Sequence, residues 1–318
     1  MGFKLVIGPP SGSRKWPGQI RVAVPDCDVQ MFATWEEAAD AIVDADAAFG
    51  AVPPETLALA GKLRWIQAWA ASPPAGYYYG ELIESDVVVT NMRGMYGDTV
   101  GHSVMAFLLA FARDLHRYFP QQLQRRWEPH TEGVVYLPEA TVLIIGMGSI
   151  GAEVARLCAA FGMTVVGIDP RVEAAPPGVL ELHKPDRLHD LLPRADFVVL
   201  GIPETPESVG MFAAREIDLM KPTAYLINVS RGAHVVLADL ARAVESGGIA
   251  GAGLDVFEFE PLPVDSALWT MPNVLITPHA AGRGPYFIER RTELFIDNCK
   301  RFNAGRPLRN VVDKAHWF

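Results

Sequence analysis

The stretch ATVLIIGMGSIGAEVARLCAAFGMTVVGID, residues 140–169, decides the fold. It begins with an apolar run typical of a buried β-strand and continues through a GxGxxG turn into a segment with helical spacing of its apolar residues. A second apolar run follows and ends at Asp169. This order of strand, glycine turn, helix, strand and acid is that of the βαβ unit that binds dinucleotides. The context, rather than the glycines alone, carries the prediction.

Each glycine of the turn has a physical role. Gly146 allows a tight turn, Gly148 lets the backbone approach a pyrophosphate, and Gly151 lets the helix pack closely on the strand. Ser149 and Ile150 lie between them, at the helix N-terminus, whose positive end attracts phosphate. We therefore predict that all five residues bind the cofactor.

Asp169 indicates which dinucleotide is bound. It lies eighteen residues after Gly151, where a carboxylate can accept hydrogen bonds from the adenosine ribose and repel a 2′-phosphate. The sequence therefore favours NAD over NADP. Arg171 could accommodate that phosphate, so NADP remains an alternative.

The chain on both sides of this unit predicts an α/β protein. Nearly all-apolar runs continue after it, as in parallel strands that helices bury on both faces. These runs span residues 140–146, 163–169, 196–200, 224–228, 251–256 and 273–277. A first set of β-rich runs, which includes FKLVI (3–7) and IRVAV (20–24), alternates with helical patterns up to residue 90. We predict two Rossmann-like or flavodoxin-like domains with doubly wound parallel sheets and a cleft between them.

Two further segments have helical patterns. Residues 98–118 form one long apolar-rich segment, and a domain boundary is expected near its start. Apolar residues also return at nearly helical spacing from 285 to 302. The length of 318 residues agrees with two domains.

Composition excludes several classes of function. A formal net charge of -9 disfavours nucleic acid as a partner. Cys27, Cys158 and Cys299 are far apart in the sequence and lack CxxC or Cys/His pairing, so neither a disulfide framework nor a metal site is predicted. The apolar runs are too short for a membrane span or a secretory signal. We expect a soluble, cytoplasmic protein.

Three ionisable residues follow predicted strands of the second set. Arg231 follows the strand AYLIN, Glu260 lies five residues after Asp255, and His279 follows NVLIT. Ligands of open α/β sheets bind beyond the carboxyl ends of the strands, so these three side chains could converge on one cleft.

These residue types suit hydride transfer to a 2-oxo acid. Such a reaction needs a cation for the carboxylate and an acid for the developing alkoxide. An arginine fork matches a carboxylate, and a histidine can give or take a proton near neutral pH. A carboxylate behind the ring fixes the tautomer and favours imidazolium. We predict these roles for Arg231, His279 and Glu260 respectively.

With these residues, the sequence resembles the D-isomer-specific 2-hydroxyacid dehydrogenases, which include phosphoglycerate dehydrogenases and glyoxylate/hydroxypyruvate reductases. The resemblance covers nearly the whole chain. Its most specific motifs are GMGSIG with Asp169, PETPES (203–208), INVSRG (227–232), GAGLDVFEFEP (251–261) and TPHAAG (277–282).

The resemblance implies roles for further residues. Arg231 and His279 would bind substrate, Asp255 would hold the nicotinamide carboxamide, and Pro203 and Thr205 would line the cofactor cleft. It also implies a homodimer that converts a small 2-oxo acid, with glyoxylate or hydroxypyruvate favoured, to a D-2-hydroxy acid.

The resemblance further implies how the chain is divided. A substrate domain would comprise residues 1–98 and 284–318, and an NAD-binding domain residues 99–283. The substrate loop would be ASPPAG, residues 71–76. Its two prolines have no N–H to donate, so Ala75 and Gly76 are the predicted substrate-binding residues.

Two other functions remain as alternatives. One is a dehydrogenase-like binding protein that senses NAD without turnover. The other is an enzyme similar to formate or phosphite dehydrogenases, which also use a cation and a histidine.

Overall fold

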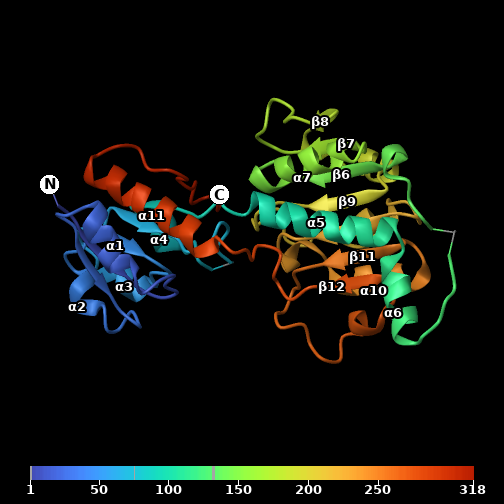
Figure 1. Cartoon of the computed structure of the whole chain (residues 1–318). Coiled ribbons are helices and arrows are strands. Elements are labelled where there is room, and N and C mark those ends of the chain that lie inside the picture. The colour runs from blue at the N-terminus through green and yellow to red at the C-terminus, as the bar shows by residue number, and fades with distance from the viewer. Residues whose placement is uncertain (1, 75, 131–132) are drawn as a thin grey trace. The chain divides into compact units, whose positions relative to one another are not determined.

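The computed structural model describes residues 2–74, 76–130 and 133–318. The chain forms two compact units (Figure 1). Unit 1 comprises Met1–Met95 and Gly284–Phe318, and unit 2 comprises Tyr96–Arg283. Each contains a parallel sheet flanked by helices, so the predicted α/β class is confirmed.

The sheet of unit 2 has seven parallel strands in the order β12-β11-β10-β9-β6-β7-β8. This is the strand order of a dinucleotide-binding sheet, whose direction of winding reverses between β6 and β9. All six apolar runs predicted for this part form strands. The seven strands of the sheet, of which β8 is not one of the predicted runs, are β6 (Thr141–Ile145), β7 (Thr164–Ile168), β8 (Glu181–His183), β9 (Phe197–Leu200), β10 (Tyr225–Asn228), β11 (Gly251–Leu254) and β12 (Val274–Ile276).

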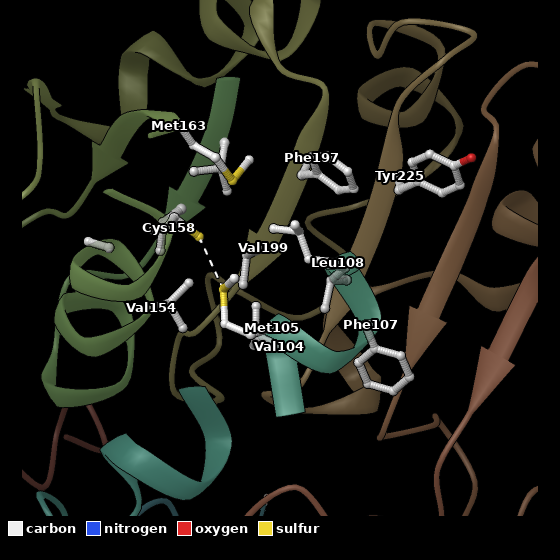
Figure 2. Close-up of a cluster of buried hydrophobic side chains, with 14 of the residues drawn as sticks. Val104, Met105, Phe107, Leu108, Val154, Cys158, Met163, Phe197, Val199 and Tyr225 are labelled. Atoms are coloured by element: carbon white, nitrogen blue, oxygen red, sulfur yellow. Dashed lines mark hydrogen bonds between the residues drawn. The ribbon is translucent and has the colours of Figure 1, made fainter. Parts of the chain in front are cut away.

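Helices cover the sheet of unit 2 and bury its apolar residues. They are α5 (Gly97–Ala112), α6 (Leu115–Leu123), α7 (Ser149–Ala160), α8 (Leu188–Leu191), α9 (Ala214–Asp218) and α10 (Leu237–Ser246). On one face, side chains of α5 and α7 meet those of β9 and β10, as Figure 2 shows. The Cys158 thiol of α7 lies 3.7 Å from the Met105 sulfur of α5. Burial raises the pKa of Cys158 to about 12, so this thiol stays protonated in the core.

The sheet of unit 1 has five parallel strands in the order β2-β1-β3-β4-β5, which is flavodoxin-like. They are β1 (Lys4–Ile7), β2 (Asp28–Met31), β3 (Ala47–Phe49), β4 (Trp65–Gln67) and β5 (Val88–Thr90). The helices are α1 (Trp16–Ala23), α2 (Ala39–Ile42), α3 (Pro54–Leu59), α4 (Gly80–Glu84) and α11 (Phe287–Asn303).

Helix α11 joins unit 1 although it lies at the other end of the chain, and Figure 1 shows it beside the N-terminal helices. The indole N–H of Trp16 on α1 donates to the Thr292 hydroxyl on α11 at 2.7 Å. The Phe295 ring of the same helix packs edge-on against the Trp16 ring, with centroids 5.2 Å apart. These contacts attach the C-terminal segment to the core of unit 1.

Two local predictions were wrong. The β-rich run at 20–24 lies mostly in α1, because Trp16 and Ile20, four residues apart, face the core while Val22 is exposed. The predicted long segment at 98–118 is two helices. They separate at Asp114, whose φ of 56° is left-handed and ends the regular helical path.

None of the helices in the described ranges has the length and apolar content that crossing a bilayer requires.

Candidate active site

The glycine turn joins β6 to α7. Gly146 has a φ of 94°, which glycine adopts readily. A Cβ at Gly151 would lie 1.9 Å from the Gly146 carbonyl oxygen, so the third glycine lets the helix close on the turn. A Cβ at Gly148 would meet no heavy atom within 4 Å, which leaves this backbone approachable. The turn thus has the geometry that the motif predicts.

The carboxylate of Asp169 is fixed at the end of β7. Its Oδ2 accepts the Met147 N–H at 2.8 Å, and its Oδ1 accepts the N–H groups of Arg171 and Val172 at 2.8 and 2.9 Å. A carboxylate offers about four acceptor sites. Three hydrogen bonds from backbone N–H groups therefore hold the carboxylate in place and leave one acceptor site for a ribose hydroxyl.

The segment PETPES follows β9, on the other side of the point where the winding reverses. Ser208 Oγ accepts the Thr205 N–H at 2.8 Å and lies 3.1 Å from the Pro203 carbonyl oxygen. The Gly146 turn follows β6, the neighbour of β9. Pro203 and Thr205 thus flank the place where open α/β sheets bind ligands.

Three neighbouring strands bring the predicted catalytic loops to one edge of the sheet. β10, β11 and β12 are parallel, and their last residues are register partners. Arg231, Glu260 and His279 each follow one of these strands. The side chains that the sequence separates by nearly fifty residues therefore belong to adjacent loops.

Glu260 and His279 form a hydrogen-bonded pair. Glu260 Oε2 lies 2.7 Å from His279 Nδ1, and Glu260 Oε1 accepts the Phe257 N–H at 3.1 Å. Because a carboxylate only accepts, Nδ1 carries a proton, and Nε2 is the nitrogen that can exchange one. The arrangement is that of an oriented acid/base histidine.

Asp255 holds the loop that carries His279. Its Oδ1 accepts the Thr277 hydroxyl at 2.6 Å and the Ala280 N–H at 2.8 Å, and its Oδ2 accepts the Ala281 N–H at 3.0 Å. The backbone N–H of His279 donates to the Asp255 carbonyl at 2.8 Å, and His279 has a left-handed φ of 49°. These bonds fix an uncommon backbone conformation. Contact of Asp255 with nicotinamide remains a prediction.

Gly232 brings the loop of Arg231 against the loop of Glu260. A Cβ at Gly232 would lie 1.8 Å from the carbonyl carbon of Phe257 and 1.9 Å from its oxygen. Only glycine allows two backbones to approach so closely.

Gly232→Ala is expected to lower the free energy of unfolding by about 1–3 kcal/mol, because the methyl group must push the two backbones apart. Thermal unfolding measures this change, and kcat/KM should fall with it. Gly61→Ala is the control, since a Cβ there meets no heavy atom within 4 Å. Equal melting temperatures for the two variants would show that the close approach of the two backbones does not require glycine at position 232.

Arg231 is partly buried, and its Nη1 donates to the Ser230 carbonyl at 2.6 Å. Burial lowers the pKa of Arg231, whereas the charges of Glu204 and Glu260 raise it. Glu204 is itself only 8% exposed. Two carboxylates thus favour the charged guanidinium that a substrate carboxylate requires.

Several buried polar residues near this site were missed from the sequence. They are Glu204, Ser208, Asn228, Ser230 and His234. Their signal is that they lie within or directly beside the motifs PETPES and INVSRG.

The predicted substrate loop lies in unit 1. Gly76 has a φ of 87°, and a Cβ there would meet no heavy atom within 4 Å. Ala75 lies outside the described residues. Substrate binding by both remains a prediction.

A dinucleotide-type sheet whose adjacent strand ends carry an arginine and a carboxylate–histidine pair is the arrangement expected of an oxidoreductase. Residues 105–281 match the family model of the D-isomer specific 2-hydroxyacid dehydrogenase NAD binding domain. The chain belongs to the D-isomer specific 2-hydroxyacid dehydrogenases, which confirms the resemblance seen in the sequence.

Relatives and solved structures agree with this membership. A glyoxylate reductase from Korarchaeum cryptofilum is 35% identical over 268 residues, 82% of this chain and 79% of that protein. A D-isomer specific 2-hydroxyacid dehydrogenase from Xanthobacter autotrophicus Py2, solved with NADPH and MES, is 30% identical with a TM-score of 0.87 over all of both chains. An NADPH-dependent glyoxylate/hydroxypyruvate reductase from Sinorhizobium meliloti, solved with NADP and sulfate, is 27% identical with a TM-score of 0.84, covering 99% of this chain and 100% of that chain.

Proposed function

We propose that this enzyme uses NAD(H) to interconvert a small 2-oxo acid and a D-2-hydroxy acid, with glyoxylate or hydroxypyruvate as the favoured substrate. The observation that carries the proposal is the 2.7 Å pair of Glu260 and His279, whose loops follow β11 and β12, beside the loop of Arg231 that follows β10. The names of the glyoxylate reductase and glyoxylate/hydroxypyruvate reductase relatives support the choice of substrate.

The side chains divide the reaction between them. Arg231 binds the substrate carboxylate and polarises the adjacent carbonyl. A nicotinamide held at this edge of the sheet would supply the hydride. His279 gives its Nε2 proton to the carbonyl oxygen, while its Nδ1 proton stays hydrogen-bonded to Glu260, which stabilises the charged ring before the transfer. In oxidation the neutral ring takes the proton back.

The cofactor is proposed to lie along the carboxyl edge of the sheet of unit 2. Its pyrophosphate would meet the glycine turn and the N-terminus of α7, its ribose Asp169, and its nicotinamide Asp255. The residues proposed to bind it are Gly146, Gly148, Ser149, Ile150, Gly151, Asp169, Pro203, Thr205 and Asp255. Substrate would contact Arg231 and His279, together with Ala75 and Gly76.

NADH is expected to give at least about a tenfold higher kcat/KM than NADPH, because the Asp169 carboxylate would face the 2′-phosphate at close range. Asp169→Ser should reduce the ratio of kcat/KM with NADH to kcat/KM with NADPH. Glu173→Ser is the matched control, since it removes an exposed acid four residues away. Two related structures were solved with NADPH or NADP, so kcat/KM has to be measured with both cofactors. Equal or reversed ratios in the wild type would overturn the assignment.

Turnover tests the reaction itself. The wild-type enzyme should oxidise NADH with glyoxylate, hydroxypyruvate or pyruvate. NADH binding without turnover would favour a sensor, and reduction of NAD by formate or phosphite would favour the other enzymatic alternative.

We further propose a homodimer formed through the segment around α6. Five large apolar side chains between residues 119 and 136 are exposed, an unusual density for a surface that stays in water. Their exposed fractions are 56% for Phe119, 87% for Leu123, 96% for Trp127, 40% for Val134 and 66% for Tyr136. A second copy of the chain would cover the same segment in return, as two-fold symmetry requires.

A reducing compartment such as the cytoplasm suits the three buried, unpaired cysteines.

Light scattering after size exclusion is expected to give twice the 34.7 kDa mass of one chain. The double variant Leu123→Glu/Trp127→Glu should shift the mass toward one chain, because dimerisation would bury two charges in an apolar contact. Val264→Glu is the control, as Val264 is 95% exposed elsewhere in unit 2. A wild-type monomer, or an unchanged mass in the double variant, would contradict this interface.

A further inference from the structure

His234 is a fully buried histidine that the reaction described above does not use. It ends a short 3-10 turn, Gly232–His234, directly after Arg231. None of its surface is exposed, and both ring nitrogens have partners. Nδ1 lies 2.9 Å from Ser230 Oγ, and Nε2 lies 3.2 Å from the Pro203 carbonyl oxygen.

The partners determine where the ring protons lie. A carbonyl oxygen only accepts, so Nε2 carries a proton and donates it to Pro203. Burial lowers the pKa of His234 to about 4, so the ring is neutral at pH 7. Its unprotonated Nδ1 can then accept the Ser230 hydroxyl proton, for which Asn228 Oδ1, also 2.9 Å from Ser230 Oγ, is the competing acceptor. The imidazole therefore bridges a donor on one loop and an acceptor on another.

One end of this bridge is the frame that holds Arg231. Asn228 Oδ1 accepts the Ser230 N–H at 3.1 Å, and Asn228 Nδ2 donates to the Arg231 carbonyl at 2.9 Å. Arg231 Nη1 in turn donates to the Ser230 carbonyl at 2.6 Å. The Ser230 carbonyl thus holds the side chain of Arg231, and Asn228 links the Ser230 backbone to the Arg231 carbonyl.

The other end is the segment that begins at Pro203. Beyond it, residues 210–212 run beside residues 233–236. The Gly210 N–H donates to the Ala233 carbonyl at 2.7 Å, and the Phe212 N–H donates to the His234 carbonyl at 2.9 Å. The next residue after Pro203 is Glu204, whose charge favours the guanidinium form of Arg231. The two loops are therefore joined at several points, and His234 supplies a side-chain connection between them.

We propose that His234 is a positioning residue that couples the loop of Arg231 to the loop of Pro203, so that substrate and cofactor are held in register for hydride transfer. An apolar side chain could fill the same space, but it would leave the Ser230 hydroxyl and the Pro203 carbonyl without these partners. The proposal rests on the proposed function, because it takes Arg231 as the substrate-binding residue and Pro203 as part of the cofactor site.

Two conservative variants separate the two ends of the bridge. The amide of Asn can occupy the position of Nδ1 and keep the Ser230 contact, whereas the longer Gln can place a donor near Nε2 and keep the Pro203 contact. His234→Asn should therefore weaken NADH binding about fivefold by fluorescence titration and leave the KM for glyoxylate nearly unchanged. His234→Gln should lower kcat/KM for glyoxylate about fivefold and leave the NADH Kd nearly unchanged. His234→Leu should do both.

The control is His116→Gln, which alters another buried histidine of unit 2 and should change the melting temperature alone. The coupling proposal is overturned if His234→Asn and His234→Gln both change only the NADH Kd or both change only kcat/KM for glyoxylate. It is also overturned if all three variants lower the melting temperature and change neither the NADH Kd nor kcat/KM. If His234→Leu does not fold, the comparison of Asn with Gln still decides. A wild-type enzyme that reduces none of the 2-oxo acids would instead overturn the proposed function, and NADH titration of the Asn and Gln variants would still test the Pro203 end.

Discussion

His279→Asn is expected to lower kcat for 2-oxo acid reduction by about 10² to 10⁴-fold, the usual contribution of a positioned general acid. Asparagine keeps a group that can donate to Glu260, so the loop should stay in place and NADH should bind as in the wild type. Steady-state rates and NADH fluorescence titration measure the two effects. A kcat within about threefold of the wild type would show that His279 is not the proton donor.

The pH profile distinguishes a proton donor from a structural residue. Reduction takes up a proton through His279 and oxidation returns one to it, so the rates in the two directions should respond to pH in opposite senses. Glu260→Gln removes the carboxylate that accepts the Nδ1 proton of His279, so kcat for reduction should fall while NADH binding persists. In His279→Asn the opposite pH dependences of reduction and oxidation should disappear. His189→Asn is a matched control, because His189 forms a similar pair with Glu216 at 3.0 Å outside the site.

Arg231→Ala should reduce kcat/KM for glyoxylate by roughly a hundredfold, equivalent to about 3 kcal/mol of transition-state stabilisation. The reason is that a partly buried guanidinium, supported by Glu204 and Glu260, is the charge proposed to bind the substrate carboxylate. Arg231→Lys should recover little, since an ammonium group cannot reproduce the planar fork. NADH binding should persist in both.

The control for this experiment is Arg242→Ala, which removes an arginine whose side chain is 69% exposed and paired on the surface with Asp239. It should keep wild-type kinetics. Near wild-type activity in Arg231→Ala would remove Arg231 from the site, whereas loss of NADH binding would indicate that the variant disturbs the sheet edge more widely.

The sequence predicted unit 2 better than unit 1 for a physical reason. Strands such as β6 and β9 are buried on both faces and read as continuous apolar runs between turn residues. In unit 1, Ile20 and its β-branched neighbour Val22 suggested a strand, but packing of Trp16 and Ile20 on one helix face overrode local propensity. The short strand β2 has only one fully buried residue and was missed.

The candidate site was predictable to the extent that it depends on strand ends. Arg231, Glu260 and His279 could be found because each ionisable side chain follows an apolar run. His234 and Gly232 could not be assigned their contacts, because their partners Pro203 and Phe257 lie more than twenty residues away in the sequence. Nothing in the local pattern tells which backbone will approach a given side chain.

The hydrogen bonds from Asp255 to the loop of His279, and the contact of Gly232 with Phe257, also bear on how such an enzyme can diversify. Each strand-end loop of unit 2 is built against its neighbour, so an insertion in one would displace the groups on the next. The loop at 71–76 belongs to the other unit. Natural variation or laboratory selection for new side chains on the 2-oxo acid should therefore accumulate in that loop, while the proton-transfer apparatus stays constant.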